Sequence, residues 1–567
     1  MPIEDKITNI ENEVDAFAGR QSLFDCPGNL MILNLLRYLE FVTFLDKEKE
    51  TKSNWINYGH SKICYNLRGV AHSIDWAYEY CSRFDSFDFR FDDKNLDKLK
   101  SIFFLSQKYD IVSDLFFYIR KGILKATYND ADKTILLNQS NQRIQLFKVI
   151  NYYIATHHVE KMVDSNALND KYDELIDRAI NIVKKIKMKG NSEFFSLDYN
   201  ISEMFDIYKI VIESNERLMH DFDEEWNIGE YKIKDFRLVF ASIITIAIVH
   251  NIFLFSIYIQ TKETINKNKL FQNLVPFYNK KKWINIINKF TNLSPEIVGS
   301  IINDLTFDPL NQKNKNKIGV TLYCFYPISD SILALSNSIA RNSYEERNIW
   351  LMLERKNRLV HSSLSNKKEE YWRKNIVSRL LKLGIWSHGK AINIGFTDID
   401  LLIIDFQNSF GLSIELKWLT ASNRAIDYSS SIDVELKKGQ KQARQCEEWL
   451  IENKKELSKK IEVDYQKIKS IIFKSVVLSK NSIGSQEVND DGDVPVISED
   501  LFWWILESPT GKSIFDLYDK AKNKSFYPEI DKHFFIQDQQ VDYAGYKFLQ
   551  KDAYIPNNKW NYLADIK

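Results

Sequence analysis

Apolar residues recur at intervals of three and four along roughly the first 330 residues, and this spacing predicts a mostly helical region. Glycine and proline, which interrupt regular structure, are sparse in the same region. We therefore expect long helices that pack against one another through their apolar faces.

One stretch of this region, Leu238 to Thr261, contains no charged residue and is long enough to cross a bilayer as a helix. His250 and Asn251 lie near its middle, and polar side chains are costly inside lipid. A helix that is apolar on all sides also suits the centre of a helical domain. We expect a buried core helix here and keep a membrane span as the alternative.

The pattern changes after about residue 365, where helix-like and strand-like segments alternate. Gly384 ends the first helical pattern, and the polar residues 407–409 predict a turn between two β-rich runs. The predicted elements are a helix at Lys367–Leu383, strands at Ile399–Asp405 and Phe410–Trp418, a helix at Asp433–Leu450, and strands at Ile471–Ser479 and Val494–Ser498. This alternation predicts an α/β domain.

The predicted fold class is a mostly α N-terminal domain followed by an α/β C-terminal domain. The expected boundaries are residues 1–362 for the helical domain, built of one or two subdomains, 363–515 for the α/β domain and 516–567 for a C-terminal extension. The extension is polar and aromatic, and its pattern predicts no particular structure.

Composition narrows the function classes only a little. The 77 basic and 77 acidic side chains cancel, which excludes a uniformly basic nucleic-acid coat but not a basic site within a balanced chain. The five cysteines are scattered without a CxxC pair, and charged residues stand at the start of the chain, where a signal peptide needs an apolar segment. We expect a cytoplasmic protein with free thiols.

The residues that point to chemistry lie between Gly395 and Leu419. Side chains alternate between the two faces of a strand, so Glu415 and Lys417 share one face. A glutamate and a lysine on an otherwise apolar strand are costly to bury unless they are paired or used. Asp400 belongs to the preceding predicted strand, and a hairpin brings its carboxylate close to that of Glu415.

Two converging carboxylates without histidine or cysteine match the oxygen ligands that Mg²⁺ (or Mn²⁺) prefers. A lysine beside them can hold or polarise a water molecule for attack on phosphorus, and the metal ion neutralises charge that develops on the phosphate oxygens. Asp400, Glu415 and Lys417 therefore indicate phosphodiester hydrolysis.

At these residues the chain resembles the PD-(D/E)XK nuclease superfamily, whose restriction-endonuclease-like fold is a mixed sheet flanked by helices. The D…(D/E)xK signature of the family matches Asp400 and the tripeptide Glu415-Leu416-Lys417. Asp398 and Asp400 resemble the paired acids that open this strand in many members. Asp400 leads directly into the strand, so it is the favoured metal ligand and Asp398 the alternative. The resemblance implies that Asp400 and Glu415 hold the metal ion and that Lys417 positions the attacking water.

Members of this family often carry a further acid on the preceding helix and a polar residue on the following one. Glu369 shares a helical face with Trp372, so we expect it to point inward and favour it over Glu370 as the further acid. Gln442 lies on the face of the second helix that points toward the sheet, where it could orient the water or contact a phosphate.

Basic residues flank the predicted site on both sides, as binding of a polyanion requires. They lie in the two predicted helices: Lys367, Lys368, Arg373 and Lys374 in the first, and Lys437, Lys438, Lys441 and Arg444 in the second. Solvated helix faces would show the same runs. The resemblance implies a DNA endonuclease, with DNA favoured over RNA as the partner, that acts in defence against foreign or phage DNA, and it leaves a homodimer open.

Two other functions stay open. A sensor or scaffold could bind nucleic acid through the α/β domain without cutting it. Arg355 and His361 also resemble the Arg-x(4–6)-His motif of HEPN-type ribonucleases, which implies metal-independent RNA cleavage, although Lys356 stands where that family usually has arginine. The preferred interpretation of these two residues is an ordinary basic helix end, where Arg and His favour the C-terminal dipole.

Overall fold

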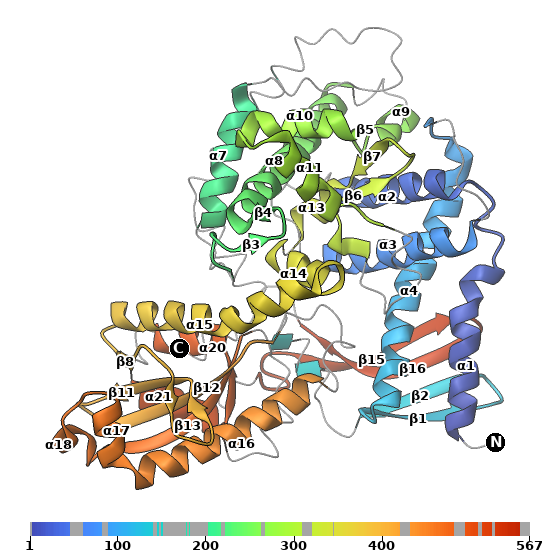
Figure 1. The fold of residues 1–567 in the computed structure, drawn as a ribbon. Coiled ribbons are helices and arrows are strands. Elements are labelled where there is room, and N and C mark those ends of the chain that lie inside the picture. The colour runs from blue at the N-terminus through green and yellow to red at the C-terminus, as the bar shows by residue number, and fades with distance from the viewer. Residues whose placement is uncertain are drawn as a thin grey trace. The chain divides into compact units, whose positions relative to one another are not determined.

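The chain divides into two units in the computed structural model (Figure 1). Residues 1–113, 158–361 and 541–546 form the helical unit, and residues 114–157, 362–540 and 547–567 form the sheet unit. The structure describes residues 3–45, 60–81, 89–139, 145–146, 149–150, 177, 181, 202–216, 222–261, 267–308, 320–343, 345–419, 431–480, 494–507, 513–523 and 528–555. Helices and strands occur in both units, so the protein is of the mixed α/β class.

Helices make up most of the helical unit. The longer ones are α1 (Ile3–Phe17), α2 (Gly28–Leu45), α3 (His60–Tyr80), α7 (Ser202–Glu216), α8 (Ile233–Thr261), α10 (Lys280–Thr291), α11 (Pro295–Asp304) and α14 (Glu345–Lys356). The shorter ones are η1 (Ala18–Arg20), η3 (Asp93–Asn95), α9 (Lys267–Gln272), η4 (Val320–Leu322) and α13 (Asn337–Arg341). α4 (Leu96–Arg120) begins in this unit and ends in the sheet unit.

The first 330 residues also contain strands, which the helical spacing did not predict. They are β1 (Leu124–Asn129), β2 (Thr134–Gln139), β3 (Asn227–Ile228), β4 (Tyr231–Lys232), β5 (Phe277–Asn279) and β6 (Phe325–Pro327), and β7 (Ile332–Leu335) follows directly. β5, β7 and β6 form one small antiparallel sheet. β3 to β7 have only two to four residues each, too few to show a two-residue alternation within a long helical region. β1 and β2 have six residues each, and the prediction missed them although strands of this length can show the alternation.

α8 is the helix that the uncharged stretch predicted, and α7, α10, α11 and α13 pack against it. Among the described residues only Ile233–Tyr258 are long and apolar enough to cross a membrane as a helix, and 78% of their most apolar stretch is buried inside the protein. His250 Nε2 lies 3.0 Å from the carbonyl oxygen of Asn273, and burial lowers the pKa of His250 to about 4. The histidine is therefore neutral and hydrogen-bonded within the protein, as a core helix requires.

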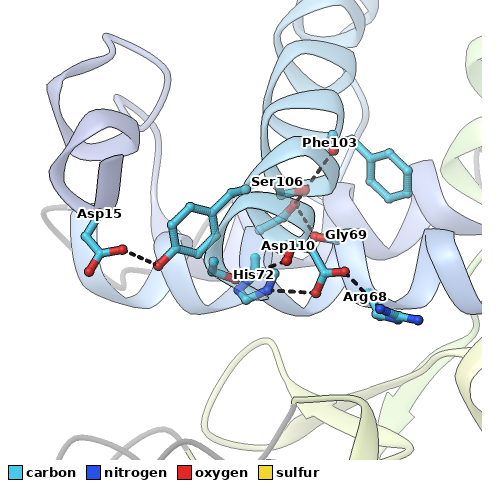
Figure 2. A network of polar contacts seen from close by, with 10 residues as sticks. Asp15, Arg68, Gly69, His72, Phe103, Ser106 and Asp110 are labelled. Carbon is cyan, nitrogen blue, oxygen red and sulfur yellow. Dashed lines mark hydrogen bonds and ion pairs between the residues drawn. The ribbon is translucent and has the colours of Figure 1, made fainter. Parts of the chain in front are cut away.

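A polar network joins α3 to α4 in the helical unit (Figure 2). The buried Asp110 carboxylate on α4 lies 3.1 Å from Nε2 of His72 and 3.4 Å from Nη1 of Arg68, both on α3. Tyr109 extends the network to α1 by donating a hydrogen bond of 2.8 Å to Asp15. Because a buried carboxylate is costly without basic partners, these contacts fix the pairing of the two long helices.

The sheet unit is built around a five-stranded mixed sheet with the strand order β14-β13-β12-β11-β8. Its strands are β8 (Trp386–His388), β11 (Leu401–Asp405), β12 (Phe410–Lys417), β13 (Ile472–Ser479) and β14 (Val496–Ser498). β11 pairs antiparallel with β8 and with β12, whereas β12, β13 and β14 run parallel to one another. The four β-rich runs of the sequence therefore meet in one sheet.

Helices lie on both faces of this sheet (Figure 1). They are α15 (Arg358–Lys382), which begins in the helical unit, α16 (Ser431–Glu452), α17 (Lys454–Lys460), α18 (Tyr465–Ile468), α20 (Glu499–Leu506) and α21 (Ile514–Lys522). Cys446 and Leu450 of α16 pack into a core with Leu402 and Phe473 on one face of the sheet. On the opposite face, α21 contacts Phe410 through aromatic side chains.

Two of the element boundaries that differ from the predicted ones lie close to the residues of interest. α15 begins at Arg358 rather than Lys367, because the side chain of Asn357 accepts a hydrogen bond of 3.2 Å from the Val360 N–H and caps the helix. The predicted strand at Ile399–Asp405 is interrupted at Asp400, between the short β10 (Asp398–Ile399), paired with β9 (Ile392–Asn393), and β11. At the other end of α15, Gly384 stops the helix as predicted, with φ of 74°.

The C-terminal extension contains α21 and a hairpin of β15 (Phe535–Tyr543) and β16 (Tyr546–Tyr554). The two-residue turn, Ala544-Gly545, has positive φ at both positions, which suits the twist of a tight hairpin. β16 pairs parallel with β2, so a four-stranded sheet of order β1-β2-β16-β15 joins the two distant parts of the chain.

Candidate active site

The β11–β12 hairpin places Asp400 opposite Glu415. Leu401 and Ile414 form the last pair between β11 and β12, so Asp400 and Glu415 stand one step beyond this pair. At the other end of the hairpin, the Asp405 carboxylate accepts hydrogen bonds from the backbone N–H groups of residues 407 and 408. This side chain fixes the turn and with it the register of the two acids.

Three of the predicted side chains contact one another directly, and the fourth contacts the backbone between them. Lys417 Nζ lies 2.7 Å from Glu415 Oε1 and 3.0 Å from Gln442 Oε1 of α16. Asp400 Oδ2 accepts a hydrogen bond of 2.8 Å from the Leu416 N–H. The Glu415 side chain is 4% exposed and that of Lys417 is 14% exposed. Glu415, Lys417 and Gln442 thus form one cluster, and Asp400 lies close enough for its charge to raise the pKa of Glu415.

Burial and mutual repulsion disfavour the charged forms of both carboxyl groups. The pKa of Glu415 is raised to about 7, first by burial and then by the charge of Asp400, with Lys417 opposing the shift. The pKa of Asp400 is raised to about 6, chiefly by burial and also by Glu369, against the hydrogen bond from the Leu416 N–H. Near neutral pH the pair is therefore partly protonated, and a bound cation would displace the remaining proton.

Gly439 of α16 makes room for the lysine. A Cβ atom at this position would lie 2.9 Å from Cε and 3.3 Å from Cγ of Lys417, and 3.3 Å from Cγ1 of Val477. Any side chain here would push Lys417 away from its partners. The sequence placed Gly439 and Gln442 on one helical face, but it contained no signal that the glycine touches the lysine.

Of the two acids considered on the preceding helix, Glu369 is the one whose charge acts on Asp400 and Glu415. Glu370 forms an ion pair of 2.8 Å with Lys374, whereas Glu369 lies close enough to raise the pKa of both Asp400 and Glu415. The expectation that Glu369 points inward is wrong, because the residue is exposed. It stands at the open side of the site, near the two buried carboxyl groups.

Arg373, one helical turn after Glu369, was predicted only as a DNA-binding residue. It lies close enough to Asp400 to act on that carboxyl group directly. Its positive charge lowers the pKa of Asp400. Its Nε atom is buried, and none of the described residues forms a hydrogen bond with it. The alternative ligand Asp398 is exposed on β10, and its carbonyl oxygen accepts a bond of 3.6 Å from Cys446.

Most of the remaining predicted basic residues are exposed. They are Lys367 and Lys374 on α15 and Lys437, Lys438, Lys441 and Arg444 on α16. Lys374 pairs with Glu370, and the half-buried Lys368 has its Nζ 5.7 Å from the centre of the Trp418 ring.

The two opposed carboxyl groups fit Mg²⁺, which commonly binds one or two carboxylates and retains several waters. Asp400 and Glu415 are the residues that would hold it. Within the described parts of the chain, no group of three or more histidine, cysteine or acidic side chains is arranged to hold a metal ion. Two carboxylates are a ligand set that suits a hard cation, whereas a structural zinc takes four ligands.

Arg355 and His361 lie on two different helices. Arg355 is in the last turn of α14, where its backbone alone is described, and His361 is in the first turn of α15. The interpretation of a single basic helix end is therefore wrong for His361, which stands at a helix N-terminus where the dipole disfavours positive charge. Its ring packs against Trp350, with 4.3 Å between ring centres.

Comparison with known proteins finds no match: no family model, no curated protein and no solved structure is similar to this chain.

Proposed function

We propose that the protein is a Mg²⁺-dependent nuclease of the PD-(D/E)XK type, with the five-stranded sheet as its restriction-endonuclease-like core. The observation that carries the proposal is the convergence of Asp400, Glu415 and Lys417 at one end of a hairpin, in the order and spacing of that signature. Each of these residues is explained by phosphodiester hydrolysis, whereas two buried acids with raised pKa values are a poor choice for stability alone.

Each residue then has a role. Asp400 and Glu415 would hold Mg²⁺ or Mn²⁺, which when bound stabilises negative charge on phosphate oxygens and makes a bound water more acidic. The ammonium group of Lys417, held between Glu415 and Gln442, is placed to donate to the attacking water. Gln442 keeps that ammonium group aimed, and Glu369 adds a further acid at the open side.

Arg373 and the exposed face of α16 suit a polyanionic substrate. The guanidinium group of Arg373 lies near Asp400, where it could contact the scissile phosphate, and Lys437, Lys438, Lys441 and Arg444 could contact phosphates further along. We favour DNA over RNA and an endonuclease that acts in the cytoplasm in defence against foreign DNA, because of the family resemblance. A homodimer that cuts both strands belongs to the same proposal.

The experiment is a cleavage assay on plasmid DNA, single-stranded DNA and RNA, with Mg²⁺, with Mn²⁺ or with EDTA. We expect cleavage that requires a divalent cation and falls about 100-fold or more in Lys417→Ala, because the variant lacks a donor aimed at the reacting water. Lys455→Ala, at an exposed position of α17, is the matched control and should cleave normally.

Two results would replace this proposal. Salt-dependent DNA binding without nicking, unchanged in Asp400→Ala and Glu415→Ala, would indicate a sensor or scaffold. RNA cleavage that persists in EDTA and disappears in His361→Ala would indicate a ribonuclease that acts through Arg355 and His361.

A further inference from the structure

A buried ion pair lies at the end of β13, the strand that pairs with β12 and so with Glu415 and Lys417. Lys480 Nζ, just after β13, is 3.1 Å from Glu499 Oε2, at the first residue of α20. Their side chains are 7% and 9% exposed. A cation and an anion removed from water at this depth are costly, and an apolar pair of similar size would usually be as stable. The pair therefore calls for an explanation other than stability.

Tryptophan side chains enclose this ion pair. The ammonium group of Lys480 lies 4.9 Å from the ring centre of Trp418 and 5.6 Å from that of Trp372, at distances of cation–π attraction. Trp503 donates from its indole N–H to Glu499 Oε1 at 3.2 Å. The two charges therefore have partners on α15 (Trp372), directly after β12 (Trp418) and on α20 (Trp503).

Two of these partners, Trp418 and Trp372, are next to residues of the proposed site in the chain. Trp418 follows Lys417 in the chain, and the Lys480 N–H donates a hydrogen bond of 3.0 Å to the Lys417 carbonyl oxygen. Trp372, whose ring meets Trp418 edge to face at 5.8 Å, stands on α15 between Glu369 and Arg373. The ion pair thus ties the end of β12 to the turn of α15 that faces Asp400.

We propose that Lys480 and Glu499 are positioning residues that hold α15 against the end of β12, so that Glu369 and Arg373 reach the acids on the hairpin. This inference rests on the proposed nuclease function. The role of the two charges is to fix the positions of neighbouring elements. Lys480 extends the β12–β13 ladder through its backbone, and its ammonium group contacts the rings of Trp418 and Trp372. Glu499 fixes the ammonium group, favoured by its place at a helix N-terminus.

The test replaces both charges by apolar residues in the double variant Lys480→Met with Glu499→Leu. Such a replacement commonly leaves stability unchanged or raises it, so we expect a folded protein with a thermal midpoint near that of wild type. Its kcat for plasmid cleavage should fall about tenfold or more with little change in KM, because the reacting groups are displaced while the exposed lysines of α16 are untouched.

The matched control removes another ion pair of the same unit. Lys474 Nζ on β13 lies 2.9 Å from Glu447 Oε1 on α16, and the two side chains are 36% and 20% exposed. Lys474→Met with Glu447→Leu should keep the wild-type kcat. If the double variant of Lys480 and Glu499 also keeps it, the pair is merely structural and the inference is overturned.

Hydrogen exchange provides a readout that does not depend on cleavage. The Leu416 amide is held by Asp400 and the Lys480 amide by Lys417, so loosening of the β12 end should speed the exchange of both. If wild type cuts no substrate, the nuclease function fails, and exchange alone decides the role of the pair: faster exchange supports it and unchanged exchange overturns it.

If the double variant fails to fold, Trp503→Phe tests the same inference. It removes the indole N–H that Glu499 accepts but leaves both charges in place. We expect a smaller loss of kcat in the same direction and faster exchange of the Lys480 amide. Wild-type values of both would overturn the positioning role.

Discussion

At the scale of single residues, the central feature is a pair of acids that the fold keeps partly protonated. Asp400 and Glu415 are brought together by the hairpin, and burial and their mutual repulsion raise both pKa values, to about 6 and about 7. Lys417 relieves part of this repulsion without removing it. A divalent cation between the two carboxyl groups would relieve the rest, so we expect metal binding and proton release to be coupled.

The sign of the resulting pH dependence follows from the raised pKa values. A carboxyl group whose folded-state pKa is raised stabilises the metal-free protein below about pH 4, and this contribution is lost as the pH rises through about 6 to 7. Asp400→Asn keeps the acceptor for the Leu416 N–H and removes the charge. We therefore expect the metal-free variant to be roughly 1–3 kcal/mol more stable than wild type at pH 8 and about equally stable at pH 4.

Denaturation at both pH values, with EDTA and with Mg²⁺, checks this prediction. Mg²⁺ should stabilise wild type at pH 8 and leave Asp400→Asn unchanged, since the variant lacks one of the two ligands. A metal-free variant that is less stable than wild type at pH 8 would contradict the repulsion between the acids.

At the scale of elements, helix α16 carries a glycine, Gly439, whose lack of a side chain makes room for Lys417. Its face toward the sheet presents Gln442 to the ammonium group of Lys417, and Gly439 leaves the space through which the lysine stem passes. Glycine in the middle of a helix usually costs stability, by about 0.5–1 kcal/mol relative to alanine. The close approach to Lys417 gives a physical reason for its presence here.

Gly439→Ala separates these two effects. The gain in helix propensity and the contact with Lys417 oppose each other, so we expect a small change in stability together with a loss of cleavage activity of about tenfold or more. Steady-state kinetics and thermal unfolding measure the two separately. In the control, Gly299→Ala on α11, the new Cβ meets only Ile284 at an ordinary 3.5 Å, and we expect slightly higher stability and unchanged activity. Full activity in Gly439→Ala would show that Lys417 tolerates displacement.

At the scale of the whole molecule, a formal net charge of zero is compatible with a nucleic-acid-binding protein, because opposite charges occupy different places. Exposed basic residues of α16 lie in the same unit as the two acids, whereas Lys232 and Lys234 in the helical unit are paired with Glu225. Binding should therefore depend on the local face and not on the total charge.

The salt dependence of DNA binding tests this distinction. Lys438→Ala with Lys441→Ala should weaken binding to duplex DNA and reduce the slope of log affinity against log salt by about 2, since each phosphate contact contributes about 0.9. Fluorescence anisotropy in EDTA measures the slope without cleavage. The control, Lys232→Ala with Lys234→Ala, should leave it unchanged, and an equal loss in both variants would argue against a binding face on α16.

The long apolar helix leads to a prediction at the same scale. Because most of the apolar stretch of α8 is buried against other helices, the protein should purify in buffer without detergent and stay in the supernatant after ultracentrifugation. Recovery only with the membrane fraction would contradict the burial of α8.

The sequence by itself determined the features that depend on near neighbours. Alternation along residues 410–418 predicted which side chains share a face, and turn-forming residues at 407–409 predicted the hairpin that pairs Asp400 with Glu415. Gly384 predicted the end of α15 because a left-handed backbone position favours glycine. Side-chain periodicity and backbone sterics act over a few residues, so both can be read from one sequence.

Only the tertiary structure decided what covers those faces. The contact of Gly439 with Lys417, the ion pair of Lys480 with Glu499 and the exposure of Glu369 all depend on how distant segments pack. The pairing of β16 with β2 likewise joins strands that are far apart in the chain. Periodicity predicts that a face is buried but does not predict which segment covers it. The covering segment depends on the packing free energy of the whole chain.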